Sequence, residues 1–464
     1  MKQTLLMIAL TLAGTLGVFF VEPFWGVAIY YLFAVLRPQS MWEWSLPPDI
    51  RWSNYVAIAS MFGSIGMALG MLPFGREAGI FAGFKRAHKV MFLFAVWICI
   101  TYVTAYDREA SWFYIVEYSK LFVMYFVAVI VVRSVRQIWI LYLLTALSLG
   151  YIAYEINFLY LVNGRLDIYH RGYGGVDNNG AGLMLAVGVP LCVYAWQATK
   201  KIWRWAFIGF VPLLLHAIML SYSRGAMVGI VLGVPLIVMR ATRRRQFAAA
   251  ILALAVLVPS MAGPEVREEF FSSSDYQEDG SAQSRFGSWS AAIAMANDHP
   301  ILGVGLRNSP LFSHRYGADI EGRVIHSQFF QILADCGYPG LFLYLMTLAT
   351  AWLSLRQVRK LMKGRTDDEA MLIKSMANGI ECGLFVFCAA AAFLSVELFE
   401  LPYVLLLLSA QLGAVTALAA QTVSPPAAAK PAPAPPAGHF GARPVPAGRG
   451  PFAPPPPAGW TRQR

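Results

Sequence analysis

Long apolar segments recur along almost the whole chain, and they constrain its fold more than any other feature. A helix needs about 20 apolar residues to cross the hydrocarbon core of a bilayer. Segments of roughly this kind occupy residues 4–20, 24–36, 55–73, 88–106, 115–133, 137–161, 181–198, 203–221, 226–240, 246–262, 338–355, 378–398 and 402–420. We therefore predict an all-α, polytopic membrane protein with about 12 transmembrane helices. The second segment is short and follows Pro23, so the count is twelve or thirteen.

Composition supports this fold class. Hydrophobic residues make up 57% of the chain and charged residues only 14%, where a soluble protein carries about a quarter charged residues. The net charge of +11 is concentrated in short loops, so it orients the protein in the bilayer and predicts no nucleic-acid partner. Membrane lipids are the expected surroundings.

Basic loops give the orientation. They lie at 132–137, 199–204, 240–246 and 356–365, and the positive-inside rule makes them cytoplasmic. The opposite side then receives 163–180, 221–225 and the large segment 263–336. For the N-terminus we favour twelve spans with Met1 in the cytoplasm and the first apolar segment retained; thirteen spans would place Met1 outside.

Domain organisation follows from these segments. Residues 1–180 form an N-terminal transmembrane region, and 181–420 form a core that includes the loop 263–336. Residues 424–464 are rich in Pro and Ala and cannot bury a core, which predicts a disordered cytoplasmic tail.

The loop 263–336 is predicted to contain short helices. In the first of them, Phe286, Trp289, Ile293 and Ala296 would share one face at helical spacing. A second helix is expected at about 324–335, ending at Gly337. All five basic residues of the loop are arginines, which favours bidentate phosphate binding.

Charged and amide side chains gather on the same side of the membrane. Arg224 stands between two apolar segments, and a charge near hydrocarbon depth is a functional hypothesis by default, although an arginine can also extend to the interface. The segment 163–180 adds Arg171, Asn178 and Asn179.

Arg285 opens the first loop helix, where the helix dipole disfavours a cation unless an anion is bound. The alternative is a surface arginine paired with a carboxylate. Arg323, one turn before His326, is either part of the same anion clamp or a surface charge.

His326 has two interpretations. As a general base, it would accept a proton from an attacking hydroxyl. As a core histidine, it would hydrogen-bond a neighbour, and helical spacing with Phe330 and Leu333 predicts partial burial. Its place beside Arg323 and on the side of Arg224 favours the base.

Motifs for metals and cofactors are missing from the sequence. The cysteines form no CxxC, no Cys/His cluster has metal spacing, and neither a Walker lysine nor a complete dinucleotide fingerprint occurs. We predict a metal-independent protein without a cofactor.

Four motifs in order resemble a known family. "RGYGGVDNNGAGLMLA", "SYSRGAMVGI", "RFGSWSAAIAMANDHPILGVG" and "HSQFFQILADCGYPGL" are similar to the O-antigen ligase/polymerase superfamily of bacterial envelope enzymes. The N-terminal "FWGVAIYYLFAVLRPQSMWEW" resembles the subgroup of exosortase A system-associated O-glycosylation ligases. The resemblance covers about residues 1–420.

This resemblance implies transfer of a glycan from undecaprenyl pyrophosphate to an acceptor hydroxyl at the periplasmic face of the inner membrane. It makes His326 the base, and it assigns the pyrophosphate to Arg224 and Arg285, with Arg171 a weaker match. Where many relatives have Asn-Pro-Asn, this chain has Asp-Asn-Asn, which bears on whether Asn178 and Asn179 position a substrate.

Several functions stay open at this point. A ligase would attach the glycan to protein or lipid, for example in lipopolysaccharide or exopolysaccharide synthesis, and a polymerase would extend the glycan on its own carrier. A transporter would place ionisable residues deep in the spans and show repeat symmetry between halves. A structural partner of an export machine would leave the Arg/His convergence unexplained.

Overall fold

The computed structural model is helical throughout the part of the chain that it describes, apart from turns and one isolated β-bridge between Tyr173 and Val176. It describes residues 2–72, 84–164, 166–241, 244–261, 280–320, 322–396 and 399–423. The predicted all-α membrane architecture is confirmed.

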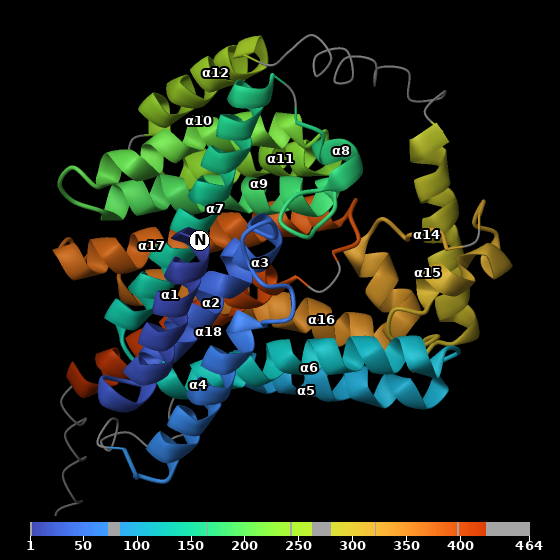
Figure 1. Ribbon diagram of the computed structural model, residues 1–464, viewed down its shortest axis with the longest axis horizontal. Coiled ribbons are helices and arrows are strands. Elements are labelled where there is room, and N and C mark those ends of the chain that lie inside the picture. The colour runs from blue at the N-terminus through green and yellow to red at the C-terminus, as the bar shows by residue number, and fades with distance from the viewer. Residues whose placement is uncertain are drawn as a thin grey trace, which may run out of the picture. The chain divides into compact units, whose positions relative to one another are not determined.

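The first half of the chain contains α1 (Lys2–Phe20), α2 (Phe24–Leu36), α3 (Pro38–Met41), α4 (Trp52–Ala68), α5 (Arg86–Ile100), η1 (Thr101–Thr104), α6 (Arg108–Val131), α7 (Val135–Asn163), α8 (Ile168–Arg171) and α9 (Asn178–Ala198). The second half contains α10 (Arg204–Leu220), α11 (Arg224–Arg240), α12 (Arg244–Met261), α14 (Gly280–Asp298), α15 (Ser309–Phe312), η3 (Ser313–Tyr316), α16 (Gln328–Leu361), α17 (Asp368–Ala391) and α18 (Glu400–Val423). Figure 1 shows their arrangement.

Eight of the described helices are long and apolar enough to cross a membrane: α1, α5 with η1, α6, α7, α9, α16, α17 and α18. Every predicted apolar segment coincides with a helix. The other five segments form α2, α4, α10, α11 and α12, which are 13 to 18 residues long. The number of crossings beyond eight therefore stays a prediction.

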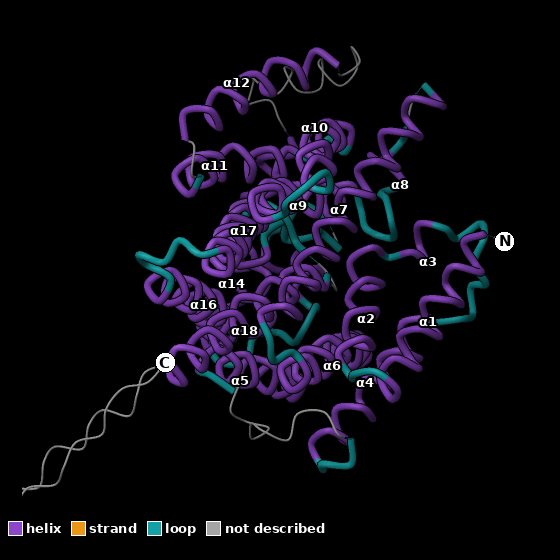
Figure 2. Tube along the Cα trace, turned by 90° about the vertical axis from the view of Figure 1, so that its left-hand side faces the viewer, coloured by secondary structure: helices purple, strands orange, loops and turns teal. Residues whose placement is uncertain are grey.

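Helix α9 is the centre of the bundle. Every residue from Ala181 to Ala195 is buried, because α7, α10, α11 and α17 all pack against it (Figure 2). Small residues permit this close packing: a Cβ at Gly182 would lie only 2.7 Å from Ser223 Cβ. The start of α9 is consequently fixed against the turn between α10 and α11.

Helix α16 starts later than predicted and contains a break. The expected helix at 324–335 begins only at Gln328, since His326 has a left-handed φ of 54° and Ser327 is extended. The predicted interruption at Gly337 is confirmed, with φ 70° and ψ −178°. A Cβ at this position would lie 2.3 Å from the carbonyl oxygen of Ile301, so close approach of the loop backbone requires glycine.

Helix α14 confirms the first predicted loop helix, and the apolar face predicted for it is largely not the buried one. The predicted face included Phe286 and Ile293, which are 47% and 39% exposed. The buried side chains are Ser288, Ala291, Ala292, Met295 and Ala296. The small residues face α16 because they allow the two helices to approach closely, while the large apolar residues remain accessible.

A buried carboxylate joins three helices at the end of α11 opposite Arg224. Glu381 of α17 is fully buried and accepts hydrogen bonds from Arg240 Nε at 2.8 Å and from Arg359 Nη2 at 2.7 Å. Arg240 ends α11 and Arg359 lies near the end of α16. Both arginines belong to the predicted cytoplasmic loops.

Contacts at the helix ends bear on the position of the N-terminus. Gln137, in the basic loop 132–137, donates to Glu22 between α1 and α2. Thr4, at the start of α1, donates to the carbonyl oxygen of Ser45 at 2.7 Å. The α1–α2 turn is therefore on the side of the basic loop, and Met1 is on the other side. This arrangement favours the thirteen-span alternative, with Met1 outside, over the twelve-span alternative; the side of Met1 and the number of spans stay predictions.

Two predicted features lie outside the described residues: the tail 424–464 and the first part of the loop, 263–279. Residues Met1–Gln421 form one compact unit, so the division at residue 180 stays a prediction.

The placement of the two turns predicts labelling of engineered cysteines in intact cells. Trp44→Cys, placed in a Cys99→Ser background, should react with a membrane-impermeant maleimide, because Trp44 is exposed beside Ser45. Arg136→Cys should react only after permeabilisation. Equal labelling of both before permeabilisation would contradict the arrangement.

Candidate active site

The turn between α10 and α11 presents Arg224, which is the first residue of α11 as predicted. The side chains of Asn178 and Asn179 hold this turn. Asn178 Nδ2 donates to the carbonyl oxygen of Ser221 at 3.1 Å, and Asn179 Oδ1 accepts from Ser223 Oγ at 3.0 Å. The two asparagines thus act on the turn that carries Arg224.

Arg171 lies on the exposed surface of the neighbouring segment. It ends the short helix α8, which is capped by Asp167. The ring of Tyr169 in α8 contacts the ring of Tyr222 with centroids 6.2 Å apart. Arg171 is therefore on a segment that touches the turn before Arg224, although the structure gives it no direct contact with the loop histidine.

His326 lies in an extended linker rather than on a helix. Two buried serines contact the linker backbone: Ser288 Oγ of α14 shares its proton between the carbonyl oxygens of Arg285 at 2.8 Å and Ile325 at 3.0 Å, and Ser313 Oγ shares its proton between those of Pro310 and Arg323, both at 3.2 Å. Ile325 itself is fully buried in a small apolar cluster with α14. These anchors hold His326 in its left-handed conformation, so it does not share a helical face with Phe330 and Leu333.

The surroundings of His326 favour a neutral imidazole. Burial, followed by the positive charges of Arg285 and Arg323, lowers the pKa of His326 from 6.5 to about 4. At neutral pH the ring is then unprotonated and able to accept a proton. The same observation brings Arg285 and Arg323 into the electrostatic vicinity of His326.

Arg323 forms an ion pair with Asp319. Its Nε donates to Asp319 Oδ1 at 2.7 Å, and its Nη2 contacts Oδ2. The arginine lowers the pKa of the Asp319 carboxyl. Arg323 therefore already binds the carboxylate of Asp319, and a bound anion would share the guanidinium with that carboxylate.

Arg285 is not at the start of its helix. Helix α14 begins at Gly280, so Arg285 lies in the second turn. The predicted conflict with the helix dipole is thus wrong, because that effect is confined to the first turn. Its positive charge helps to lower the pKa of His326, and this interaction connects Arg285 with the site.

The segment 392–396 between α17 and α18 connects Arg224 and His326. Leu394 packs against Gly225, where an added Cβ would lie 3.1 Å from its side chain. The amide of Val396 donates to Gln328 Oε1 at 3.0 Å, two residues after His326. One short segment therefore touches the neighbours of both residues and places them at the same end of the bundle.

Sequence reasoning missed the residues that support the site. Ser288, Ser313 and Gln328 are each buried, and each bonds a backbone group of a loop. The available signal was a polar residue inside an otherwise apolar pattern, as Ser288 is between Phe286 and Ala291. That signal does not identify the hydrogen-bond partner of the polar residue, so it could not assign a role to that residue.

The described ranges show no candidate metal site. They contain no group of three or more His, Cys, Asp or Glu side chains arranged to hold a metal ion. The expectation of a metal-independent site stays a prediction.

The comparison with known families gives a match to part of the chain. Residues 211–345 match the family model described as O-antigen ligase. The match covers less than a third of the chain and supports a similarity to membrane glycan transferases of the O-antigen ligase type. The matched segment contains Arg224, Arg285, Arg323 and His326, while Arg171, Asn178 and Asn179 precede it. No curated protein matches the chain.

Removal of the Ser288 hydroxyl tests whether the linker positions His326. Ser288→Ala should lower kcat for glycan transfer about tenfold, with the helical content unchanged, because the lost hydrogen bond is worth about 1 kcal/mol and the histidine must be held accurately. Ser290→Ala, exposed on the same helix, is the matched control. Equal activities in the two variants would contradict a positioning role.

Proposed function

We propose that the protein is a membrane glycan ligase that moves an oligosaccharide or polysaccharide from undecaprenyl pyrophosphate to an acceptor hydroxyl at the periplasmic face of the inner membrane. The observation that carries this proposal is the convergence of His326 with the charges of Arg285 and Arg323, at the same end of the bundle as Arg224. All four residues fall inside the O-antigen ligase match.

His326 would act as the general base. An unprotonated imidazole takes the proton of the acceptor hydroxyl as that oxygen attacks the sugar carbon. The new C–O bond forms while the bond from the sugar carbon to the pyrophosphate oxygen breaks, and that oxygen keeps the electron pair. One such displacement inverts the configuration at the sugar carbon. The proton then passes from the imidazolium to water.

The arginines would stabilise the departing pyrophosphate. Guanidinium groups bind phosphate oxygens in a bidentate manner, and fixed charges are most effective where negative charge develops. We assign this work to Arg224 and Arg285, with Arg323 shared with Asp319 and Arg171 reaching from the surface. Asn178 and Asn179 contribute by fixing the turn that carries Arg224.

The lipid character of the donor fits the position of these residues. Arg224 begins a helix of the apolar bundle, while His326 lies in the loop next to it. An amphipathic donor can keep its polyprenyl chain in the membrane and present its pyrophosphate at this level. The acceptor is a hydroxyl of a protein, a lipid or a growing chain, as in the exosortase-associated O-glycosylation ligases. A polymerase would use the same site with the carrier-bound glycan as acceptor.

Two substitutions test the assignment in the purified full-length protein. His326→Ala should lower kcat by about 10²–10⁴-fold, as expected for loss of a general base. Arg224→Ala should lower kcat/KM for the lipid-linked donor by about tenfold or more, because a charge-assisted contact is lost. His170→Ala and Arg136→Ala, both exposed, are the matched controls.

The products of the same assay separate the two enzymatic functions. Glycan attached to added protein or lipid acceptor indicates a ligase, and a longer carrier-bound glycan indicates a polymerase. Wild-type rates in both His326→Ala and Arg224→Ala would contradict the site.

The low pKa of His326 predicts the pH dependence. Since the base must be unprotonated and its pKa is about 4, kcat/KM should be constant from neutral pH downward and be halved only near that pKa. A bound pyrophosphate offsets the arginine charges, so the acid limb of kcat should lie at higher pH.

The variant Arg323→Gln tests whether the arginine charges lower the pKa of His326. Removing a positive charge that lowers the pKa of His326 should move the acid limb of kcat/KM to higher pH. Arg315→Gln is the control, because Arg315 lies over the ring of Phe312 and is not among the charges that act on His326. An acid limb at pH 6.5 in the unaltered protein would refute the proposed environment.

A further inference from the structure

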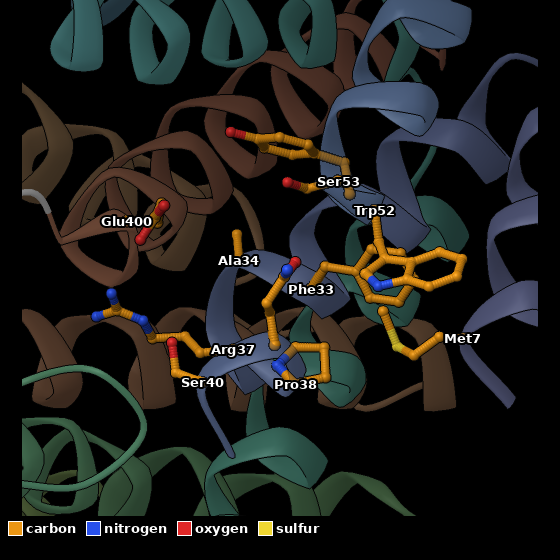
Figure 3. A pocket seen from close by; sticks show the side chains of 11 residues that line it. Met7, Phe33, Ala34, Arg37, Pro38, Ser40, Trp52, Ser53 and Glu400 are labelled. Carbon is orange, nitrogen blue, oxygen red and sulfur yellow. The ribbon is translucent and has the colours of Figure 1, made fainter. Parts of the chain in front are cut away.

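A cavity of about 160 Å³ lies where α1, α2, α3, α4 and the first residue of α18 meet (Figure 3). Its wall includes Met7, Phe33, Arg37, Trp52, Ser53 and Glu400. One water molecule needs a cavity volume of only about 10–15 Å³. This cavity therefore has room for a larger group.

Two buried donors in the wall lack hydrogen-bond partners in the described part of the chain. The indole Nε1 of Trp52 has none, although the residue is only 7% exposed, and the buried Nη1 of Arg37 has none either. Buried polar groups are nearly always paired in folded proteins. Two orphan donors facing one cavity indicate a place for acceptor atoms of a ligand.

The cavity also contains an acceptor. Glu400 begins α18, and its charge attracts that of Arg37, yet the two residues form no ion pair within the described ranges. In Figure 3 these charged groups are on one side of the cavity and Trp52, Phe33 and Met7 are on the other. A ligand must therefore satisfy the Arg37 donor and the Glu400 carboxyl on one side, and the aromatic surface and the indole N–H of Trp52 on the other.

These demands exclude simple ions. Glu400 would repel a phosphate, and Arg37 would repel a cation. A sugar ring meets all of them, because its hydroxyls both donate and accept while its C–H face packs on an aromatic ring. We propose that this cavity binds one neutral sugar ring of the glycan.

Its position links it to the candidate active site. Glu400 follows Val396 by four residues, and Val396 is bonded to Gln328 beside His326. Arg37 faces the glycine turn that precedes Asn178, since a Cβ at Gly175 would lie 3.7 Å from Arg37 Nη2. The inference rests on the proposed glycan transfer for the source of the sugar, which belongs to either the donor or the acceptor.

Binding is measured first, without any transfer. Full-length protein in lipid nanodiscs is titrated with methyl glycosides of the common hexoses and N-acetylhexosamines, with saturation-transfer NMR as the readout. At least one glycoside should bind. Arg37→Gln should weaken it about tenfold and Trp52→Phe about fivefold, since the first loses a charged donor and the second loses the indole N–H and part of the aromatic surface.

Matched controls come from the same segment. Arg51→Gln and Trp44→Phe alter exposed residues outside the cavity and should leave the affinity unchanged. Binding by none of the glycosides, or equal weakening in the controls, would overturn the proposal.

The transfer assay then identifies the source of the sugar. A raised KM for the lipid-linked donor in Trp52→Phe assigns the ring to the donor glycan, and a raised KM for the acceptor assigns it to the acceptor. Glycoside binding without transfer by the unaltered protein would refute the proposed function but keep the cavity. Transfer with unchanged binding and KM values in Trp52→Phe would refute the cavity alone.

Discussion

Buried backbone polar groups in the turns at one end of the bundle must be hydrogen-bonded, and they lie outside the regular hydrogen bonds of the helices. The protein meets this requirement with side chains. Asn178 bonds the turn before Arg224, Ser288 bonds the linker before His326, and Gln328 bonds the segment 392–396. Each bond also fixes a residue of the candidate active site, so the stability of the turns and the geometry of the site have the same origin.

The opposite end of the bundle depends on charge. Glu381 is fully buried between Arg240 and Arg359, and removing one member of a buried ion pair costs about 3–5 kcal/mol. Helix α11 thus has a structural arginine at one end and a candidate catalytic arginine at the other. The ion pairs of Glu381 with Arg240 and Arg359 thus fix one end of the helix, while Arg224 at the other end can respond to a substrate.

The sequence predicted the regular parts well, because the length and polarity of apolar segments are local properties. Each predicted span is a helix, and the break at Gly337 is where glycine and proline indicated it. The errors have a common cause. The linker at His326 is extended because distant serines bond it, and the buried face of α14 consists of small residues because α16 lies close.

The end of the bundle at which the chain starts is indicated by a contact between Gln137 and Glu22, and no local sequence pattern contains this contact. The residue types of the candidate site could be predicted from the sequence, but the side chains that hold these residues in place could not. The bond from Ser288 to Ile325, and the unpaired donor atoms of Trp52 and Arg37, are visible only in three dimensions.

The central claim is that His326 activates an acceptor hydroxyl for one direct displacement of a pyrophosphate. The most direct measurement is the anomeric configuration of the product, determined by NMR after transfer from a polyprenyl-pyrophosphate oligosaccharide of known configuration. The account predicts inversion at the transferred sugar carbon, with release of the polyprenyl pyrophosphate. Retention of configuration would contradict it, because retention requires a second displacement through an intermediate that this mechanism does not contain.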